Sequence, residues 1–332
     1  RVTGAAEPAM AGPEHLALAM SQTYAEGLAM LPATPSPSPK PAEETKELSA
    51  VSPTRVKETP APSQPVVSAP ASAQETPYPF VFADHGEYLL VCEKDTKILY
   101  IFRLLDEKFS LVKQYPCIIG ANNHDKRLEG DFATPEGVYF FLRFAPGRTL
   151  AEKYGYGAFV LNYPNFLDRK ERKEGGGIWL HGHSAGKIVG ADIPDTKGCI
   201  VVSNDALKEM SGFLKSNGTP IAIVNKLQFT NLESQKELAK ELNNFLNSWR
   251  QSWESINTKK YLSFYSPAFV NAEGMSYNAF KRHKERTNRS KKFIKVKMEN
   301  LAILMPPEHG GNVAVARFQR RYRSAHFSET PP

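Results

Sequence analysis

The residue best suited to chemistry in this sequence is a cysteine that follows a glycine. Cys199 lies in the run Thr-Lys-Gly-Cys-Ile, and His181 stands at the end of an earlier apolar run, Ile-Trp-Leu-His. A cysteine attacks a carbonyl carbon only as the thiolate, and a neighbouring imidazole can take the thiol proton. These two residues therefore predict a cysteine enzyme that transfers acyl groups.

Both residues belong to motifs that resemble the L,D-transpeptidase (YkuD-type) catalytic domain. His181-Gly182 followed by residues 196–199 is similar to the family's His-Gly and Ser/Thr-x-Gly-Cys pattern. Upstream, residues 130–137 match its Gly-Asp-x-x-Thr-Pro-x-Gly turn, and residues 156–165 resemble the strand before the active site. Separated motifs in the family's order are more specific than one motif. The resemblance covers residues 85–226.

The resemblance implies a role for each residue of the two motifs. Cys199 is the expected nucleophile, and His181 is the expected proton carrier, with its imidazole held by the backbone carbonyl of Gly182. The backbone N–H groups of Cys199 and Gly198 are the expected donors to the oxyanion.

Three further residues lie close to these motifs in the sequence. His183 competes with His181 for the base role, but the family motif favours His181, so His183 is expected to line the substrate cleft. Lys197 stands where many family members carry histidine. It favours the thiolate, contacts a substrate carboxylate, or is simply solvated. Asn204 either binds substrate or caps the following helix.

Two tyrosines, Tyr139 and Tyr156, are expected to shape the same cleft. The other two cysteines, Cys92 and Cys117, lie in apolar strand-like runs. Small buried side chains are the favoured interpretation there, and a disulfide is the alternative.

The segments around these residues have sequence patterns that are typical mainly of β-strands. Period-two alternation predicts a mainly β catalytic domain over residues 81–228, a YkuD-like β-sandwich with few helices. Its expected strands span residues 87–93, 98–104, 109–119, 137–143, 157–161, 177–181, 199–202 and 220–224. Ser203 is expected to cap a helix of about three turns that follows the nucleophile.

Residues 229–332 have a different pattern. A helical apolar stripe, followed by a Tyr-x-x-Phe-Tyr segment, a short helix and two strands, resembles the nuclear-transport-factor-two-like α+β cone. The chain ends at Pro332, before a strand that this family normally adds, so the domain is either truncated or incomplete. The stripe consists of Leu238, Leu242, Phe245, Trp249, Trp253 and Ile256.

The N-terminal part lacks the composition of a folded domain. Residues 31–80 are rich in Pro, Ala and Ser without an apolar period, which predicts a disordered linker. Residues 1–30 contain good helix formers, so a short helix is expected to dock onto a domain or to pair with a second chain as a homodimer.

Composition narrows the partners. The formal charge of +7 suits a polyanionic cell wall. The basic run over residues 281–297 is either a solvated face or a wall-binding surface. No recognition module for nucleic acid is present, so nucleic acid is not expected, and neither a metal nor a cofactor is expected. The apolar runs are too short to span a bilayer. The chain begins without Met, as expected after removal of a signal peptide or a membrane anchor. The resemblance implies a substrate outside the cytoplasmic membrane, so an exported protein of the periplasm or cell wall is expected.

The resemblance implies a reaction at the L,D amide of peptidoglycan tetrapeptide stems, through a thioester on Cys199. We expect capture of the acyl group by an amine of a second stem or of a wall protein, which makes the enzyme an L,D-transpeptidase. In the alternative, capture by water would make it an L,D-carboxypeptidase that trims tetrapeptide to tripeptide, as in cell-shape enzymes with both domains. An inactive wall-binding module is the third possibility.

Overall fold

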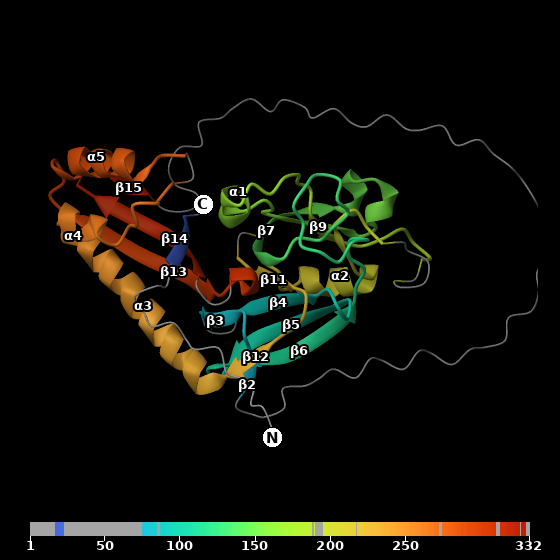
Figure 1. The fold of residues 1–332 in the computed structure, drawn as a ribbon. Helices are drawn as coiled ribbons and strands as arrows, with labels where there is room; N and C mark the ends of the chain where they lie inside the picture. Colours follow the sequence, from blue (N-terminus) through green and yellow to red (C-terminus); the bar gives the residue numbers. More distant parts are fainter. Residues whose placement is uncertain are drawn as a thin grey trace, which may run out of the picture.

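The computed structural model describes most of the chain from residue 75 onward. The described residues are 17–22, 75–84, 87–187, 189, 195–216, 218–271, 274–309, 313–325 and 327–329. They form two large sheets, a small two-stranded sheet, five α-helices and short 3-10 turns (Figure 1). None of the helices in this part of the chain is long and apolar enough to cross a membrane.

The catalytic part is built on one eight-stranded sheet. In spatial order its strands are β10 (Ile200–Val201), β9 (Trp179–His181), β8 (Gly157–Leu161), β7 (Gly137–Pro146), β11 (Pro220–Val224), β4 (Tyr88–Glu93), β5 (Ile98–Leu105) and β6 (Lys108–Pro116). Just after β6, Ile118 forms an antiparallel bridge to Val201 on β10, at the opposite end of the sheet. The sheet therefore curls back on itself, and the prediction of a mainly β domain with few helices is confirmed.

Both faces of this sheet are buried in its middle. On β4, Leu90 and Cys92 point into the core inside the curl, whereas Leu89 and Val91 point to the opposite face. This alternation is the period of a β-strand. Cys92 and Cys117 are both free, with their sulfur atoms 4.0 Å apart in the buried core.

Helix α2 (Asn204–Ser211) closes the inner core. The Oγ atom of Ser203 accepts a hydrogen bond from the backbone N–H of Ala206 at 3.1 Å, so Ser203 is the N-cap, as predicted. Leu207 and Met210 then project into the core on one side of the helix. The helix thereby fixes the chain shortly after Cys199. A shorter helix, α1 (Phe166–Lys170), follows β8.

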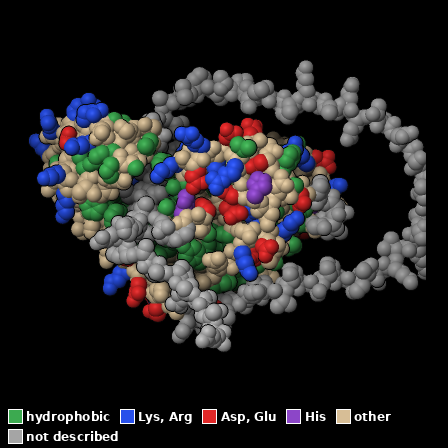
Figure 2. Space-filling model, viewed as in Figure 1, with side chains coloured by type: hydrophobic (Ala, Val, Ile, Leu, Met, Phe, Trp, Pro, Cys, Tyr) green, Lys and Arg blue, Asp and Glu red, His purple; other side chains and the backbone are tan. Residues whose placement is uncertain are grey.

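The C-terminal part has the α+β arrangement expected for a nuclear-transport-factor-two-like (NTF2-like) domain. Strands β13 (Ile294–Leu304) and β14 (Val313–Ser324) form a long antiparallel hairpin, and helix α3 (Leu232–Glu254) lies across it (Figure 1). Helices α4 (Thr258–Leu262) and α5 (Tyr277–Asn288) complete the helical side. Figure 2 shows Lys and Arg side chains gathered at the end of the molecule that carries α5.

The buried stripe of α3 differs from the prediction at one position. Leu242, Trp249 and Trp253 are buried as expected, but Phe245 is 37% exposed and Leu246 takes its place in the core. Steps of four, three and four residues keep Leu242, Leu246, Trp249 and Trp253 on one side of the helix. Phe245 instead contacts Phe264 edge to face at 5.3 Å.

The segment before the catalytic domain is structured, contrary to the predicted linker. Strand β2 (Glu75–Pro77) pairs with β12 (Phe229–Asn231), and β3 (Phe80–Ala83) pairs with β13 of the C-terminal sheet. The assignment of residues 75–80 to a linker was therefore wrong, because Phe80 and Val81 supply apolar surface that both domains bury. The rest of the predicted linker, up to residue 74, lies outside the described residues.

The predicted N-terminal helix is also corrected where the structure describes it. Strand β1 (Ala17–Gln22) pairs in parallel with residues 313–318 of β14. An open strand edge offers a row of unpaired backbone groups, whereas a short isolated helix is only marginally stable. The other residues of the segment lie outside the described part, and the homodimer stays a prediction.

A shared apolar core joins the two large sheets. Leu89 and Val91 on β4 and Phe140 on β7 pack in one cluster with Phe80 on β3 and Leu304 on β13. The C-terminal sheet thus covers the outer face of the catalytic sheet.

Candidate active site

The alternation of β9 and β10 places the two reactive residues on the same side of the sheet. The strands are parallel, with Ile200 beside Leu180 and Val201 beside His181. Leu180 and Ile200 point into the core inside the curl. Since side chains alternate, His181 points to the other side, and so does Cys199, which lies one residue before β10 and comes beside Trp179.

The imidazole of His181 is held in one tautomer. Its Nδ1 lies 2.6 Å from the backbone carbonyl oxygen of Gly182, to which it donates, so Nε2 carries the lone pair. The ring is 8% exposed and meets the ring of Tyr154 edge to face at 4.9 Å. Burial lowers the pKa of His181, although the hydrogen bond to Gly182 opposes this effect. The ring is therefore neutral at neutral pH and can accept a proton.

The thiol of Cys199 lies in a partly enclosed position. Its Sγ is 3.4 Å from the carbonyl oxygen of Gly177. Burial raises the pKa of the thiol, while a hydrogen bond from the backbone of Trp179 and the charge of Lys153 act in the opposite direction. At neutral pH the thiol of Cys199 is therefore protonated and the imidazole of His181 is neutral.

Two residues of a 3-10 turn belong to this site and were missed from the sequence. The turn Glu152–Tyr154 places the ring of Tyr154 against both His181 and Trp179. Lys153 lies with its Nζ 5.2 Å from the centre of the Tyr154 ring, and its charge acts on both His181 and Cys199. No motif or period marks this turn in the sequence.

The glycine before Cys199 is required by close backbone packing. Gly198 has φ of +120°, and a Cβ atom there would come within 2.6 Å of the carbonyl oxygen of Ala133. The N–H of Gly198 donates to Oγ1 of Thr196 at 3.0 Å. This N–H was predicted to donate to an oxyanion, but it is already used in that hydrogen bond. The same Oγ1 donates to the carbonyl oxygen of Cys199 at 2.7 Å, which fixes the turn.

Tyr139 does not line the cleft. Its side chain is fully buried in the core inside the curl, and its hydroxyl donates to the carbonyl oxygen of Glu136 at 3.0 Å. Burial, together with the charge of Asp168, raises the pKa of Tyr139 well above its ordinary value. The prediction was wrong because β7 is buried on both faces. The alternation of its side chains therefore could not show whether Tyr139 faces a cleft or the core.

Asn204 holds two loops of the site together rather than facing solvent. Its Oδ1 accepts hydrogen bonds from the backbone N–H of Tyr156 at 2.9 Å and of His183 at 3.2 Å, and its Nδ2 donates to the carbonyl oxygen of His183 at 2.7 Å. A Cβ atom at Gly182 would collide with Oδ1, at 2.1 Å. Asn204 therefore sets the backbone that follows His181.

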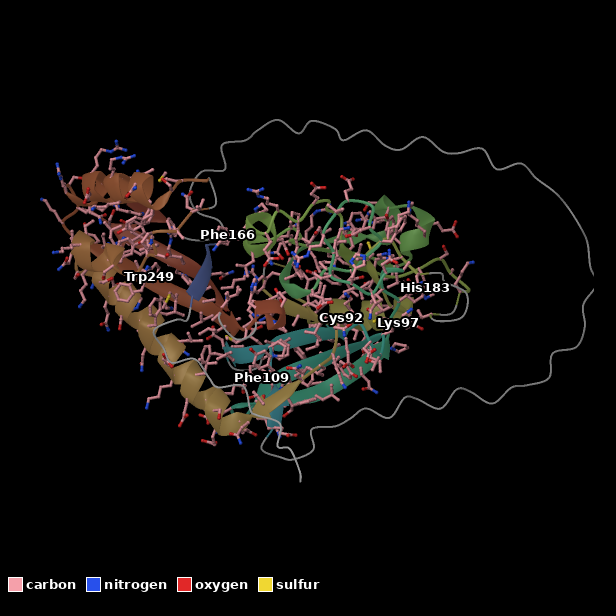
Figure 3. The ribbon with its side chains drawn as sticks, in the orientation of Figure 1. Cys92, Lys97, Phe109, Phe166, His183 and Trp249 are labelled. Atoms are coloured by element: carbon pink, nitrogen blue, oxygen red, sulfur yellow. The ribbon has the colours of Figure 1, made fainter. Side chains whose placement is uncertain are left out.

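His183 and Tyr156 flank this region. Tyr156 is 38% exposed, and its hydroxyl lies 3.3 Å from Oγ of Ser211. His183 is nearly buried, with Nδ1 2.9 Å from the carbonyl oxygen of Ser184, and its Nε2 has no hydrogen-bond partner among the described residues. In Figure 3, His183 lies at the end of the catalytic part, far from Trp249 on α3.

The contacts of Asn204 predict a positioning role. We expect Asn204→Ala to lower kcat by up to about 100-fold, because small displacements of reacting groups are costly, with a smaller change in KM. Asn204→Asp keeps the acceptor oxygen for both N–H groups and is expected to recover part of kcat. Steady-state kinetics on the two variants test this, and an unchanged kcat in Asn204→Ala would refute it.

The lowered pKa of His181 predicts that kcat/KM keeps its value down to an unusually low pH and falls only below it. Because only the neutral imidazole accepts the thiol proton, kcat/KM should rise with pH through the lowered pKa of His181, below the ordinary value of 6.5. The Lys153→Gln variant removes a charge that lowers the pKa of both His181 and Cys199, so the fall should move to higher pH. A pH profile of kcat/KM for both proteins provides the measurement, and a wild-type fall above 6.5 would contradict the prediction.

The curled sheet with this cysteine, histidine and glycine turn defines a class of cysteine acyl-transfer enzymes. Residues 87–223 match the family model of the L,D-transpeptidase catalytic domain, and residues 241–331 match that of the Cds6 C-terminal NTF2-like domain. The protein is therefore an enzyme of the L,D-transpeptidase family, with an NTF2-like domain after the catalytic domain, and it acts on peptidoglycan.

Two solved proteins resemble the chain across both domains. Bd1075 from Bdellovibrio bacteriovorus is 27% identical, with a TM-score of 0.60, over 77% of this chain and 90% of that one. Two structures of the helical cell shape determining protein Pgp2 from Campylobacter jejuni are 24% and 25% identical, each with a TM-score of 0.56. They cover 76% of this chain and 87% and 86% of theirs. The search of curated proteins gave no match.

Proposed function

We propose that the enzyme cleaves the L,D amide between the third and fourth residues of a peptidoglycan tetrapeptide stem, with Cys199 as nucleophile. The observation that carries this proposal is the parallel register of β9 and β10, which brings His181 and Cys199 to one side of the sheet. The family match over residues 87–223 supports the same substrate class. Such a substrate lies outside the cytoplasmic membrane, so the enzyme works in the periplasm or at the cell wall.

Each chemical step has a group to perform it. His181 Nε2 takes the proton of the Cys199 thiol, and Sγ attacks the carbonyl carbon of the diamino acid. The C–N bond then breaks as His181 returns the proton to the leaving amine of D-alanine, and a thioester remains. The backbone N–H of Cys199 is the proposed donor to the oxyanion, since that of Gly198 is already bonded to Thr196.

The fate of the thioester decides the product. We favour capture by water, which makes the enzyme an L,D-carboxypeptidase that leaves a tripeptide. The likeness to a cell shape determining protein extends through both domains at 25% identity, which supports a role in trimming stems for cell shape. Capture by an amine of a second stem or of a wall protein, as in an L,D-transpeptidase, uses the same catalytic residues and is the alternative.

Incubation with a purified disaccharide tetrapeptide tests the proposal. Mass spectrometry should show a tripeptide product and free D-alanine. A cross-linked dimer of stems would instead establish transpeptidation. Unchanged substrate together with retained binding to isolated cell walls would refute both activities and leave a wall-binding module.

A further inference from the structure

An exposed aromatic residue lies on the turn that precedes β7. Phe132 is 41% exposed and has φ of 55°, in the left-handed region that a bulky side chain rarely adopts. Backbone in such a conformation persists only where its surroundings enforce it, and it is often found at functional sites. The position of this ring is therefore imposed by the turn.

Asp131 enforces the turn through four hydrogen bonds. Its carboxylate accepts them from Nζ of Lys126 at 2.7 Å and from the backbone N–H groups of Arg127 at 2.7 Å, Leu128 at 3.0 Å and Ala133 at 3.1 Å. The carbonyl oxygen of Phe132 also accepts a hydrogen bond, at 3.1 Å, from the backbone N–H of Asn122. The turn is thus fixed on both sides of Phe132.

This turn packs directly on the nucleophile segment. Oγ1 of Thr134 donates to the carbonyl oxygen of Gly198 at 3.1 Å. Because Gly198 has no side chain, the backbone of Ala133 can approach it closely. A Cβ atom at Gly198 would overlap the carbonyl oxygen of Ala133. Phe132 therefore stands beside the residue that precedes Cys199.

A cation lies next to the exposed ring. Nζ of Lys197 is 5.7 Å from the centre of the Phe132 ring, and Lys197 is itself exposed. Lys197 comes two residues before Cys199. A flat apolar surface and a mobile ammonium group are therefore presented together beside the nucleophile.

We propose that Phe132 and Lys197 form the subsite for the leaving D-alanine residue of the stem. In D-alanine the methyl group and the carboxylate are bonded to one carbon, next to the amide nitrogen that is released. The ring of Phe132 would contact the methyl group, and Lys197 would pair with the carboxylate. This assignment rests on the proposed function.

Binding measurements separate this proposal from catalysis. In a Cys199→Ala background, stem tetrapeptides ending in D-alanine, D-alaninamide or glycine are titrated, and their dissociation constants are compared. The acid should bind about tenfold tighter than the amide, and D-alanine tighter than glycine. In the added Lys197→Gln variant the acid should lose its advantage over the amide. In the added Phe132→Gly variant, which also relieves the backbone at this position, D-alanine should lose its advantage over glycine.

The exposed Lys240→Gln on α3 serves as the matched control and should leave both preferences intact. If the acid keeps its full advantage in Lys197→Gln, or D-alanine keeps its advantage in Phe132→Gly, the subsite assignment is wrong. Failure of the wild-type enzyme to convert tetrapeptide would count against the proposed reaction, whereas these binding preferences would still decide the subsite.

Discussion

Replacement of Cys199 by alanine is expected to reduce tetrapeptide conversion by at least about 1,000-fold. The variant keeps the fold, because the side chain is small and lies outside the core, but it lacks the atom that forms the thioester. Cys199→Ser should fall nearly as far. The serine hydroxyl has a much higher pKa than a thiol, and burial lowers the pKa of His181, which makes it a weaker base. Product formation followed by mass spectrometry gives the measurement.

Alkylation provides an independent control on the same variants. Cys92 and Cys117 are buried, at 0% and 3% exposure. Folded wild-type protein should therefore gain a single iodoacetamide adduct, on Cys199, and Cys199→Ala should gain none. Full activity in Cys199→Ala would remove the nucleophile assignment and the acyl-transfer mechanism with it.

Replacement of Phe80 by alanine is expected to lower the free energy of unfolding by about 3–5 kcal/mol. Phe80 is fully buried and lies in the cluster that joins the two sheets. Its ring contacts Phe102 at 5.9 Å and Phe109 at 5.4 Å, both on the catalytic side. Urea denaturation followed by tryptophan fluorescence measures the loss. All three tryptophans are described, at positions 179, 249 and 253, so the signal reports on both domains.

A matched substitution separates this effect from a general cost of losing a phenylalanine. Phe166 on α1 is 36% exposed, and Phe166→Ala should cost far less, within about 1 kcal/mol. Equal losses for the two variants, or no loss for Phe80→Ala, would show that the segment before the catalytic domain is not an essential part of the folded body.

The sequence was most informative where a strand or a turn has one strict local requirement. Residues 157–161 and 220–224 were predicted as strands and are strands with those bounds, because apolar runs of this length end at glycine or polar residues. Ser203 was predicted as an N-cap because a hydroxyl before a helix satisfies a free N–H group. The Gly198-Cys199 pair could also be recognised in the sequence. A side chain at position 198 would collide with the backbone of Ala133, which explains why this residue is glycine.

Prediction was weaker where the answer depended on residues far away in the chain. Tyr139 looked like a cleft residue because nothing local says that both faces of β7 are covered. The roles of Lys153 and Tyr154 depend on a short turn that happens to fold over His181. From the sequence, Asn204 could either bind substrate or cap a helix. Its actual hydrogen bonds go to the backbone of Tyr156 and His183, which are distant in the sequence.

The strand β3 has a consequence for how the chain is assembled. Asp84, just after β3, bonds through its carboxylate to the backbone of Leu301, 217 residues later in the chain. In topological terms the catalytic module is an insertion within the NTF2-like module. During synthesis β3 cannot pair with β13 until almost the whole chain has been made. A single cut near residue 228 would therefore leave the NTF2-like fragment without two of its strands, β1 and β3.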